Sequence, residues 1–219
     1  MLDRFLLNIS NNVNLRSIVK RKTLTESPGK NYVDMVTITN FKSKKQKKII
    51  FITARVHPGE TPASFVCEGI INYLIGNSED AAKLRDYFVF KIVPMLNPDG
   101  VINGNYRCSL SGYDLNRIWH CDNKDSSPEI YYTKRAILEQ EKCFLFIDLH
   151  AHSKKKGVFM YGCQSRASPY ISRHIPYLFW KEIPSFNYYQ CNFGMRLGRE
   201  GTSRLAINRL LNLPYCYTM

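Results

Sequence analysis

The stretch IIFITARVHPGETPASFVCEGIINYLIG, residues 49–76, predicts a buried strand followed at once by a helix. Residues 49–56 form a nearly continuous apolar run, which is typical of a strand buried on both faces. Residues 61–76 predict a helix, because Thr61 can cap it and Pro62 suits its first position. The turn between the two elements is short and carries polar side chains, so it decides what this end of the strand can bind.

Strands and helices alternate along the rest of the chain. Further strands are predicted at 32–41, 87–96, 143–150 and 157–162, and a further helix at 127–142. The alternation predicts an α/β fold, in which helices cover both faces of one sheet.

The 219 residues suit one large domain, which we place at 32–219, preceded by a polar leader at 1–31. A hydrophobic content of 44% is enough for a sizeable core. The seven cysteines are irregularly spaced and include no CxxC pair, which favours a reduced, cytoplasmic compartment over a disulfide framework. No signal peptide and no apolar run of about 20 residues is visible, so we expect a soluble protein.

The net charge is +13, from 31 Lys and Arg against 18 Asp and Glu. Such a balance favours an acidic partner, although it can also serve solubility alone. Nucleic-acid binding rests on charge only, because the sequence has no aromatic-interleaved basic motif, helix-turn-helix or zinc-knuckle spacing. We therefore expect an acidic polypeptide as the partner, rather than nucleic acid or a membrane.

Metal-binding side chains follow two of the predicted strands. His57 and Glu60 come after the 49–56 strand, and His150 ends the 143–150 strand. In open α/β sheets, ligands collect at the carboxyl ends of the strands. Two histidines and one glutamate are a known set of protein ligands for catalytic zinc, so the sequence raises a zinc site as a hypothesis.

Asp148 lies two residues before His150, on the same face of its strand, where it can orient a ligating imidazole. His152 is a second-ranked ligand, because the alternation of the strand ends before it. Other interpretations remain open at this point: His57 and Glu60 also fit a solvated surface turn, and His150 also fits a histidine that bonds only to backbone.

Three segments together resemble the zinc metallocarboxypeptidases, specifically the cytosolic carboxypeptidases that trim glutamates from tubulin. They are TARVHPGETPAS (53–64), PMLNPDGVINGNYRCSLSGYDLNRIW (94–119) and FIDLHAHSKKKGVFMYG (146–162). They occur in the order of the family, and GNYRCSL followed by DLNR separates this branch from the secreted digestive enzymes. The resemblance implies a three-layer α/β/α sandwich around a mixed, mostly buried sheet.

The resemblance also implies a catalytic apparatus. One zinc ion per chain would be bound by His57, Glu60 and His150, and Arg107 would polarise the scissile carbonyl and stabilise the oxyanion. The general base of the family is a glutamate directly after a segment like Tyr-Thr-Met at 217–219. The sequence stops there, so we expect it to be a piece, truncated at its C-terminus, of a longer enzyme.

Substrate recognition follows from the same resemblance. Asn116 and Arg117 match the pair that holds the terminal carboxylate of the substrate, which makes the enzyme an exopeptidase. Arg204 falls at the floor of the side-chain pocket, where a cation favours a C-terminal glutamate or aspartate. The predicted function is removal of C-terminal glutamate from acidic tails, such as those of tubulin, in the cytoplasm and at the cytoskeleton.

Two other functions remain as alternatives. The first is a non-catalytic module with this fold that binds acidic tails. The second is a zinc deacylase of the aspartoacylase type, which shares the HxxE…H ligands but acts on small N-acyl amino acids. The segment GNYRCSL argues against the deacylase.

Overall fold

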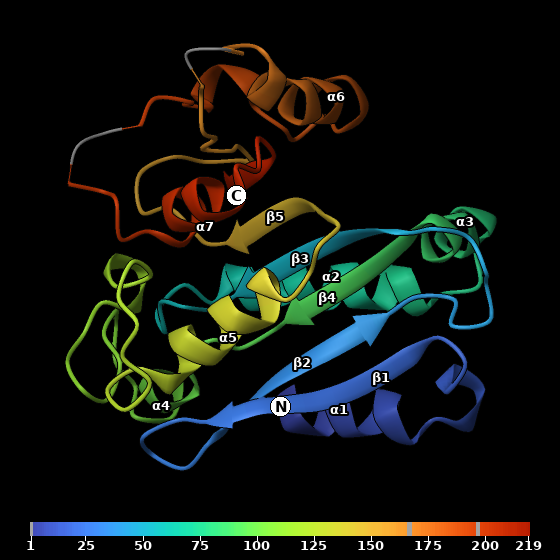
Figure 1. Cartoon of the computed structure of the whole chain (residues 1–219), viewed down its shortest axis with the longest axis horizontal. Helices are drawn as coiled ribbons and strands as arrows, with labels where there is room; N and C mark the ends of the chain where they lie inside the picture. Colours follow the sequence, from blue (N-terminus) through green and yellow to red (C-terminus); the bar gives the residue numbers. More distant parts are fainter. Residues whose placement is uncertain (1, 166–167, 196–197) are drawn as a thin grey trace.

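A mixed sheet organises the computed structural model, which describes residues 2–165, 168–195 and 198–219. Six strands of the described chain lie in the order β1-β2-β4-β3-β5-β6 (Figure 1). The strands are β1 (Val19–Glu26), β2 (Tyr32–Ile38), β3 (Lys48–Ala54), β4 (Phe88–Val93), β5 (Cys143–Leu149) and β6 (Cys216–Thr218). The α-helices are α1 (Leu2–Asn11), α2 (Pro62–Ile75), α3 (Glu79–Tyr87), α4 (Pro98–Ile102), α5 (Pro128–Leu138), α6 (His174–Glu182) and α7 (Ser203–Leu211).

The centre of the sheet is parallel. Strand β3 pairs in parallel with β4 on one side and with β5 on the other, and β5 pairs in parallel with β6. Strands β1 and β2 extend the sheet beyond β4 in antiparallel pairing. Because β3, β4 and β5 run in the same direction, their carboxyl ends meet at one edge, and the segments that follow them come together there.

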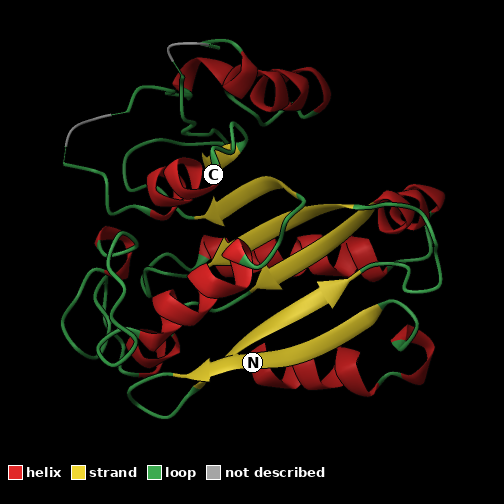
Figure 2. Cartoon of the chain, viewed as in Figure 1, coloured by secondary structure: helices red, strands yellow, loops and turns green. Residues whose placement is uncertain are grey.

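Helices cover both faces of the sheet, so the predicted α/β/α sandwich is confirmed (Figure 2). On one face, Leu6 of α1 and Ile71 of α2 are buried in a core with apolar residues of the central strands. On the other face, Ile137 of α5 and Ile207 of α7 are buried against Phe51 of β3. No helix of the described chain has both the length and the apolar character needed to cross a membrane. All seven cysteines are free thiols.

The strands predicted at 49–56, 87–96 and 143–150 and the helices predicted at 61–76 and 127–142 correspond to β3, β4, β5, α2 and α5. Pro62 opens α2 as expected, but the side chain of Thr61 makes no capping hydrogen bond. The NPDG turn continues into the short helix α4, with Asn97 as its N-cap.

The strand predicted at 157–162 is wrong. This segment forms only isolated bridges, at Val158 and Tyr161, and no ladder. Its apolar residues Phe159 and Met160 are buried without belonging to a strand, and an apolar run does not distinguish these two cases. Beyond β5 the sheet ends in the short strand β6, which was not among the predicted strands.

Residues 1–31, which their polar composition set apart as a leader, contribute to the sheet. Strand β1 pairs with β2 from Val19 opposite Ile38 to Glu26 opposite Tyr32. Most residues of β1 are only partly buried or exposed, as expected for an edge strand, so its sequence lacks the apolar run that reveals a central strand.

Glu129 of α5 is buried without compensation. Its side chain is 1% exposed, and neither carboxylate oxygen has a hydrogen-bond partner among the described residues. Burial, with a smaller contribution from the charge of Asp99, raises the pKa of Glu129 from 4.5 to about 7. A raised pKa means that the fold favours the protonated form of this carboxyl.

We expect Glu129 to make the protein less stable as the pH rises. Its contribution is fully present below pH 4.5, the usual pKa, and is lost as the pH rises through about 7. Glu129→Gln should remove this loss, so the free energy of unfolding of the variant relative to wild type should increase between pH 5 and pH 8, by up to about 3 kcal/mol.

Urea unfolding at both pH values measures this difference. Glu139→Gln, at an exposed position near the end of the same helix, is the matched control and should leave the pH dependence unchanged. Parallel pH profiles for wild type and Glu129→Gln would contradict the assignment.

Candidate metal centre

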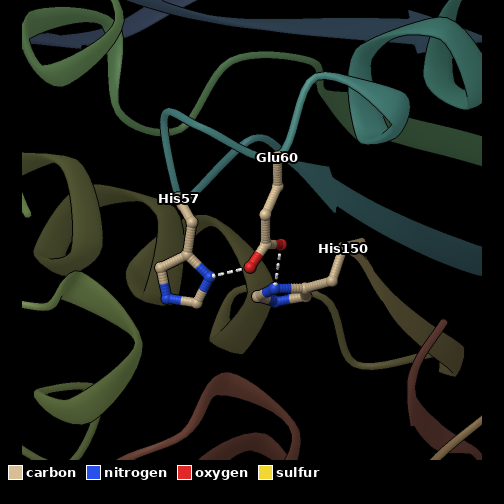
Figure 3. Close-up of side chains that lie close together, drawn as sticks. All are labelled: His57, Glu60 and His150. Carbon is tan, nitrogen blue, oxygen red and sulfur yellow. Dashed lines mark hydrogen bonds and ion pairs between the residues drawn. The ribbon is translucent and has the colours of Figure 1, made fainter. Parts of the chain in front are cut away.

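His57, Glu60 and His150 converge at the carboxyl ends of β3 and β5 (Figure 3). Nδ1 of His57 lies 2.8 Å from Oε1 of Glu60, and Nδ1 of His150 lies 2.8 Å from Oε2 of the same carboxylate. One ligand atom from each of the three residues lies within 4.8 Å of the other two. Three side chains that the sequence singled out separately therefore form one cluster.

The turn that carries His57 and Glu60 is held on several sides. The backbone N–H of Glu60 donates to the carbonyl of His57 (3.2 Å), which closes the turn on itself. The N–H of Gly59 donates to the carbonyl of Tyr106 (2.8 Å). A β-carbon at Gly59 would lie 2.8 Å from that oxygen, so this approach requires glycine.

Two further carboxylates fix the orientation of the imidazoles. Nε2 of His57 lies 3.0 Å from Oδ1 of Asp114, and Nε2 of His150 lies 2.7 Å from Oδ2 of Asp148. With Nε2 of each ring at a carboxylate, Nδ1 of each ring is directed at Glu60, so both rings present the same atom to the centre. The sequence predicted the role of Asp148 from its strand position, and the structure confirms the contact.

Asp148 is itself fully buried and accepts hydrogen bonds from neighbouring elements. Thr53 of β3 donates to Oδ1 (2.7 Å), and Ser203 at the start of α7 donates to Oδ2 (2.5 Å). Burial alone would raise its pKa, but the charge of His150 and these hydrogen bonds outweigh burial, and the pKa lies below its usual range. Asp148 thus stays ionised where it orients the ligand.

The site concentrates negative charge around the imidazoles. Burial favours a raised pKa for Glu60, but hydrogen bonds from His150 and His57 outweigh it and hold the pKa well below its usual range. Burial likewise opposes protonation of His150, yet Asp148 and Glu60 raise its pKa to about 10. An ionised cluster of this kind favours a bound cation, and coordination at Nδ1 takes the place of a proton.

The donor set fits zinc. Two imidazole nitrogens and a carboxylate oxygen are ligands that zinc accepts, and a three-ligand set leaves a position for water or substrate. The imidazoles already have the outer carboxylates that orient such ligands. His152 is exposed and its Nδ1 accepts backbone N–H groups of Lys154 and Lys155, so it lies outside the cluster.

Three residues assigned to substrate contacts lie next to the cluster. Arg107 donates from Nε to Oδ2 of Asp114 (2.7 Å), and Nη1 of Arg117 lies 3.8 Å from the same oxygen. Nδ2 of Asn116 lies 3.2 Å from Nε2 of His150, and its Oδ1 accepts the N–H of Ser203 (2.8 Å). The site therefore joins a cation-binding centre to a pair of anchored arginines.

Arg204, the fourth such residue, is buried at the start of α7. Its Nη1 donates to the carbonyl of Gly162 and contacts Sγ of Cys163 (3.3 Å). Its Nε is buried and has no hydrogen-bond partner among the described residues.

Sequence reasoning missed Asp114, which connects the two halves of the site. It accepts from His57 at one oxygen and from Arg107 at the other. Burial would raise its pKa, but His57 and Arg107 hold the pKa well below its usual range. Asp114 opens the DLNR segment, and an acidic residue directly before two residues already assigned to the site was the available signal.

Replacing Asp114 should weaken metal binding without removing a ligand. Asp114→Asn keeps the shape of the side chain but loses the charge that orients His57, so we expect an affinity for zinc about 10- to 100-fold lower. His57→Ala should abolish stoichiometric binding. Competition with a coloured chelator measures both affinities, and the exposed Asp80→Asn serves as the control. An unchanged affinity in Asp114→Asn would show that the carboxylate does not support the centre.

Comparison with known proteins agrees with this geometry. The zinc carboxypeptidase family model matches residues 10–175. Cytosolic carboxypeptidase 3 of Bos taurus is 43% identical over 218 residues, which cover 94% of this chain and 22% of that protein. Cytosolic carboxypeptidase 2 of Homo sapiens is 42% identical over 228 residues, which cover 100% of this chain and 25% of that protein. The chain thus spans about a quarter of the length of these relatives.

Solved structures show the same fold. The metallo-carboxypeptidase from Burkholderia cenocepacia matches with a TM-score of 0.87 at 24% identity, covering 99% of this chain and 58% of that one. Carboxypeptidase A from Helicoverpa armigera matches with a TM-score of 0.75 at 16% identity, covering 99% of this chain and 62% of that one. Since the family model covers most of the sequence, including His57, Glu60 and His150, the chain belongs to the zinc carboxypeptidase family.

Proposed function

We propose that this chain forms the metal-binding part of a zinc-dependent carboxypeptidase that removes C-terminal acidic residues, glutamate above all, from protein tails such as those of tubulin. The observation that carries the proposal is the convergence of His57, Glu60 and His150 within 4.8 Å, beside two arginines tied to Asp114. A cation centre next to fixed guanidinium groups suits hydrolysis at the end of a chain that carries a carboxylate. We place this activity in the cytoplasm, as the names of the relatives suggest.

A zinc ion at this centre supplies Lewis-acid activation of water and of the scissile carbonyl. The side chains of the chain position the substrate and stabilise the negative charge that develops. Arg107, held at Nε by Asp114, offers its remaining N–H groups to the carbonyl oxygen where negative charge develops.

Recognition of the chain end falls to Arg117 together with Asn116. Arg117 donates from Nη1 to the carbonyl of Asn116 (2.7 Å), which fixes one edge of its guanidinium. Its side chain is about one-third exposed (33%), so the group is anchored and still reachable. A fixed guanidinium binds a carboxylate with two parallel hydrogen bonds, and in a protein tail only the last residue offers a free main-chain carboxylate.

Preference for an acidic last residue rests on Arg204. The buried Nε–H of Arg204 has no acceptor among the described residues, and an unsatisfied buried donor is costly unless a ligand accepts its hydrogen bond. A glutamate side chain supplies both the acceptor and the opposite charge. The net charge of +13 adds attraction for acidic tails at longer range, which raises the rate of encounter.

Binding should depend on the free C-terminal carboxylate. We expect a glutamate-rich peptide with a free C-terminus to bind the zinc-loaded chain at least 10-fold more tightly than the same peptide with a C-terminal amide. Arg117→Ala should remove this difference, whereas the exposed Arg135→Ala should keep it. Calorimetry measures binding, and mass spectrometry measures loss of the last residue. Equal binding of the two peptides would contradict exopeptidase recognition.

Arg204 should set the preference between last residues. In wild type, a peptide ending in glutamate should bind about 10- to 100-fold more tightly than one ending in leucine, because the charged hydrogen bond is lost with leucine. Arg204→Met should reduce this ratio towards one, and Arg204→Lys should keep part of it. Circular dichroism checks that both variants are folded. A ratio that survives in folded Arg204→Met would assign the preference to another residue.

A further inference from the structure

We propose that Arg55 is a positioning residue of the metal centre, because its guanidinium holds the HPGE turn in the shape that brings His57 and Glu60 to one point. The proposal rests on the metal site of the proposed function but not on its substrate. Arg55 lies between the last residue of β3 and the first metal ligand, and neither the motif nor the proposed catalysis uses it.

The backbone of Arg55 has a conformation that arginine rarely adopts. Its φ is +57°, in the left-handed region, where a β-carbon crowds the backbone. Glycine and asparagine accept this region with less strain. A bulky residue at such a position persists where the surrounding structure holds it, and such strain tends to cluster at functional sites. We therefore expect the side chain of Arg55 to make contacts that offset this backbone strain.

The guanidinium of Arg55 donates two such hydrogen bonds. Nε of Arg55 donates to the carbonyl of Pro58 (2.8 Å), in the middle of the turn, and Nη1 donates to Oγ of Ser64 (2.7 Å), in the first turn of α2. One rigid, planar group thus ties the turn to the helix that follows it. A lysine has a single nitrogen and cannot copy this fork.

The helix needs such a tie at this end. Thr61 occupies the N-cap position of α2 but makes no side-chain capping bond. The link from Arg55 to Ser64 instead fixes the start of the helix relative to the turn. A second contact comes from Tyr106, whose carbonyl accepts the N–H of Gly59 (2.8 Å). The turn is therefore clamped between a backbone contact and the guanidinium, and loss of one clamp should let the two ligands move apart.

Arg55→Gly removes the two hydrogen bonds of the guanidinium and at the same time relieves the strain of the left-handed backbone. Glycine accepts the backbone conformation, so folding should not suffer, but the two hydrogen bonds disappear. We expect the affinity for Zn²⁺ to fall about 10-fold or more, with no decrease in the thermal unfolding midpoint of the metal-free chain. The visible spectrum of the Co²⁺-loaded chain should change as well, since it reports the arrangement of the ligands.

Matched variants isolate the cause. Lys30 also has a left-handed backbone (φ 65°) but lies in an exposed turn, so Lys30→Gly relieves the same strain and should leave the Zn²⁺ affinity unchanged. Ser64→Ala removes one of the two bonds and should lose part of the affinity, with no further loss when added to Arg55→Gly. Arg55→Lys should fall between wild type and Arg55→Gly.

Wild-type affinity and an unchanged Co²⁺ spectrum in Arg55→Gly would overturn the proposal, because the guanidinium would then be dispensable. A loss of affinity that is equal in Lys30→Gly would also overturn it. Failure of the wild-type chain to bind Zn²⁺ would instead contradict the metal centre itself, so the two failures are distinguishable. Competition against a fluorescent zinc indicator gives all the affinities.

Discussion

Parallel pairing of β3 with β5 is the constraint on which the site depends. The register sets Thr53 beside Asp148 and Ala54 beside Leu149, so the two strands end level with one another. The hydrogen bond from Thr53 to Asp148 locks the same register through side chains. Ligands from residues 57 and 60 therefore meet a ligand from residue 150 although about 90 residues separate them in sequence. A slip of β5 by one residue would turn Asp148 and His150 together to the other face of the sheet, away from Thr53 and Glu60.

The centre combines two opposite electrostatic demands within one cluster. A divalent cation needs ionised carboxylates, which Glu60, Asp114 and Asp148 provide, whereas the anionic chain end of the proposed substrate needs cations, which the partly exposed Arg107 and Arg117 provide. Asp114 satisfies both, because one oxygen faces His57 and the other faces Arg107. Asp114 thereby holds Arg107 beside the carboxylates that surround the imidazoles.

The sequence was sufficient for the parts of the site that lie on regular structure. Apolar runs located β3 and β5, strand ends located His57 and His150, and the alternation of side chains located Asp148. Asp114 belongs to an irregular loop, where no periodicity relates a residue to its neighbours in space, so spacing could not place it. Strand β1 was missed for another reason, because an edge strand with polar residues has no apolar run. The segment 157–162 was predicted wrongly because its apolar residues are buried outside any ladder.

The segment after β4 differs in its role from the segments after β3 and β5. The segment after β4 supplies no metal ligand, although its polar residues also reach the ligand edge of the sheet. Nδ2 of Asn97 instead donates to the carbonyl of Val56 (3.1 Å), directly before the first ligand. A β-carbon at Gly100 would lie 2.5 Å from Cγ of Pro58, so α4 packs against the ligand turn as closely as a glycine allows. Two strand ends therefore carry the candidate ligands, while the segment after β4, the strand beside β3, supports the turn that carries His57 and Glu60.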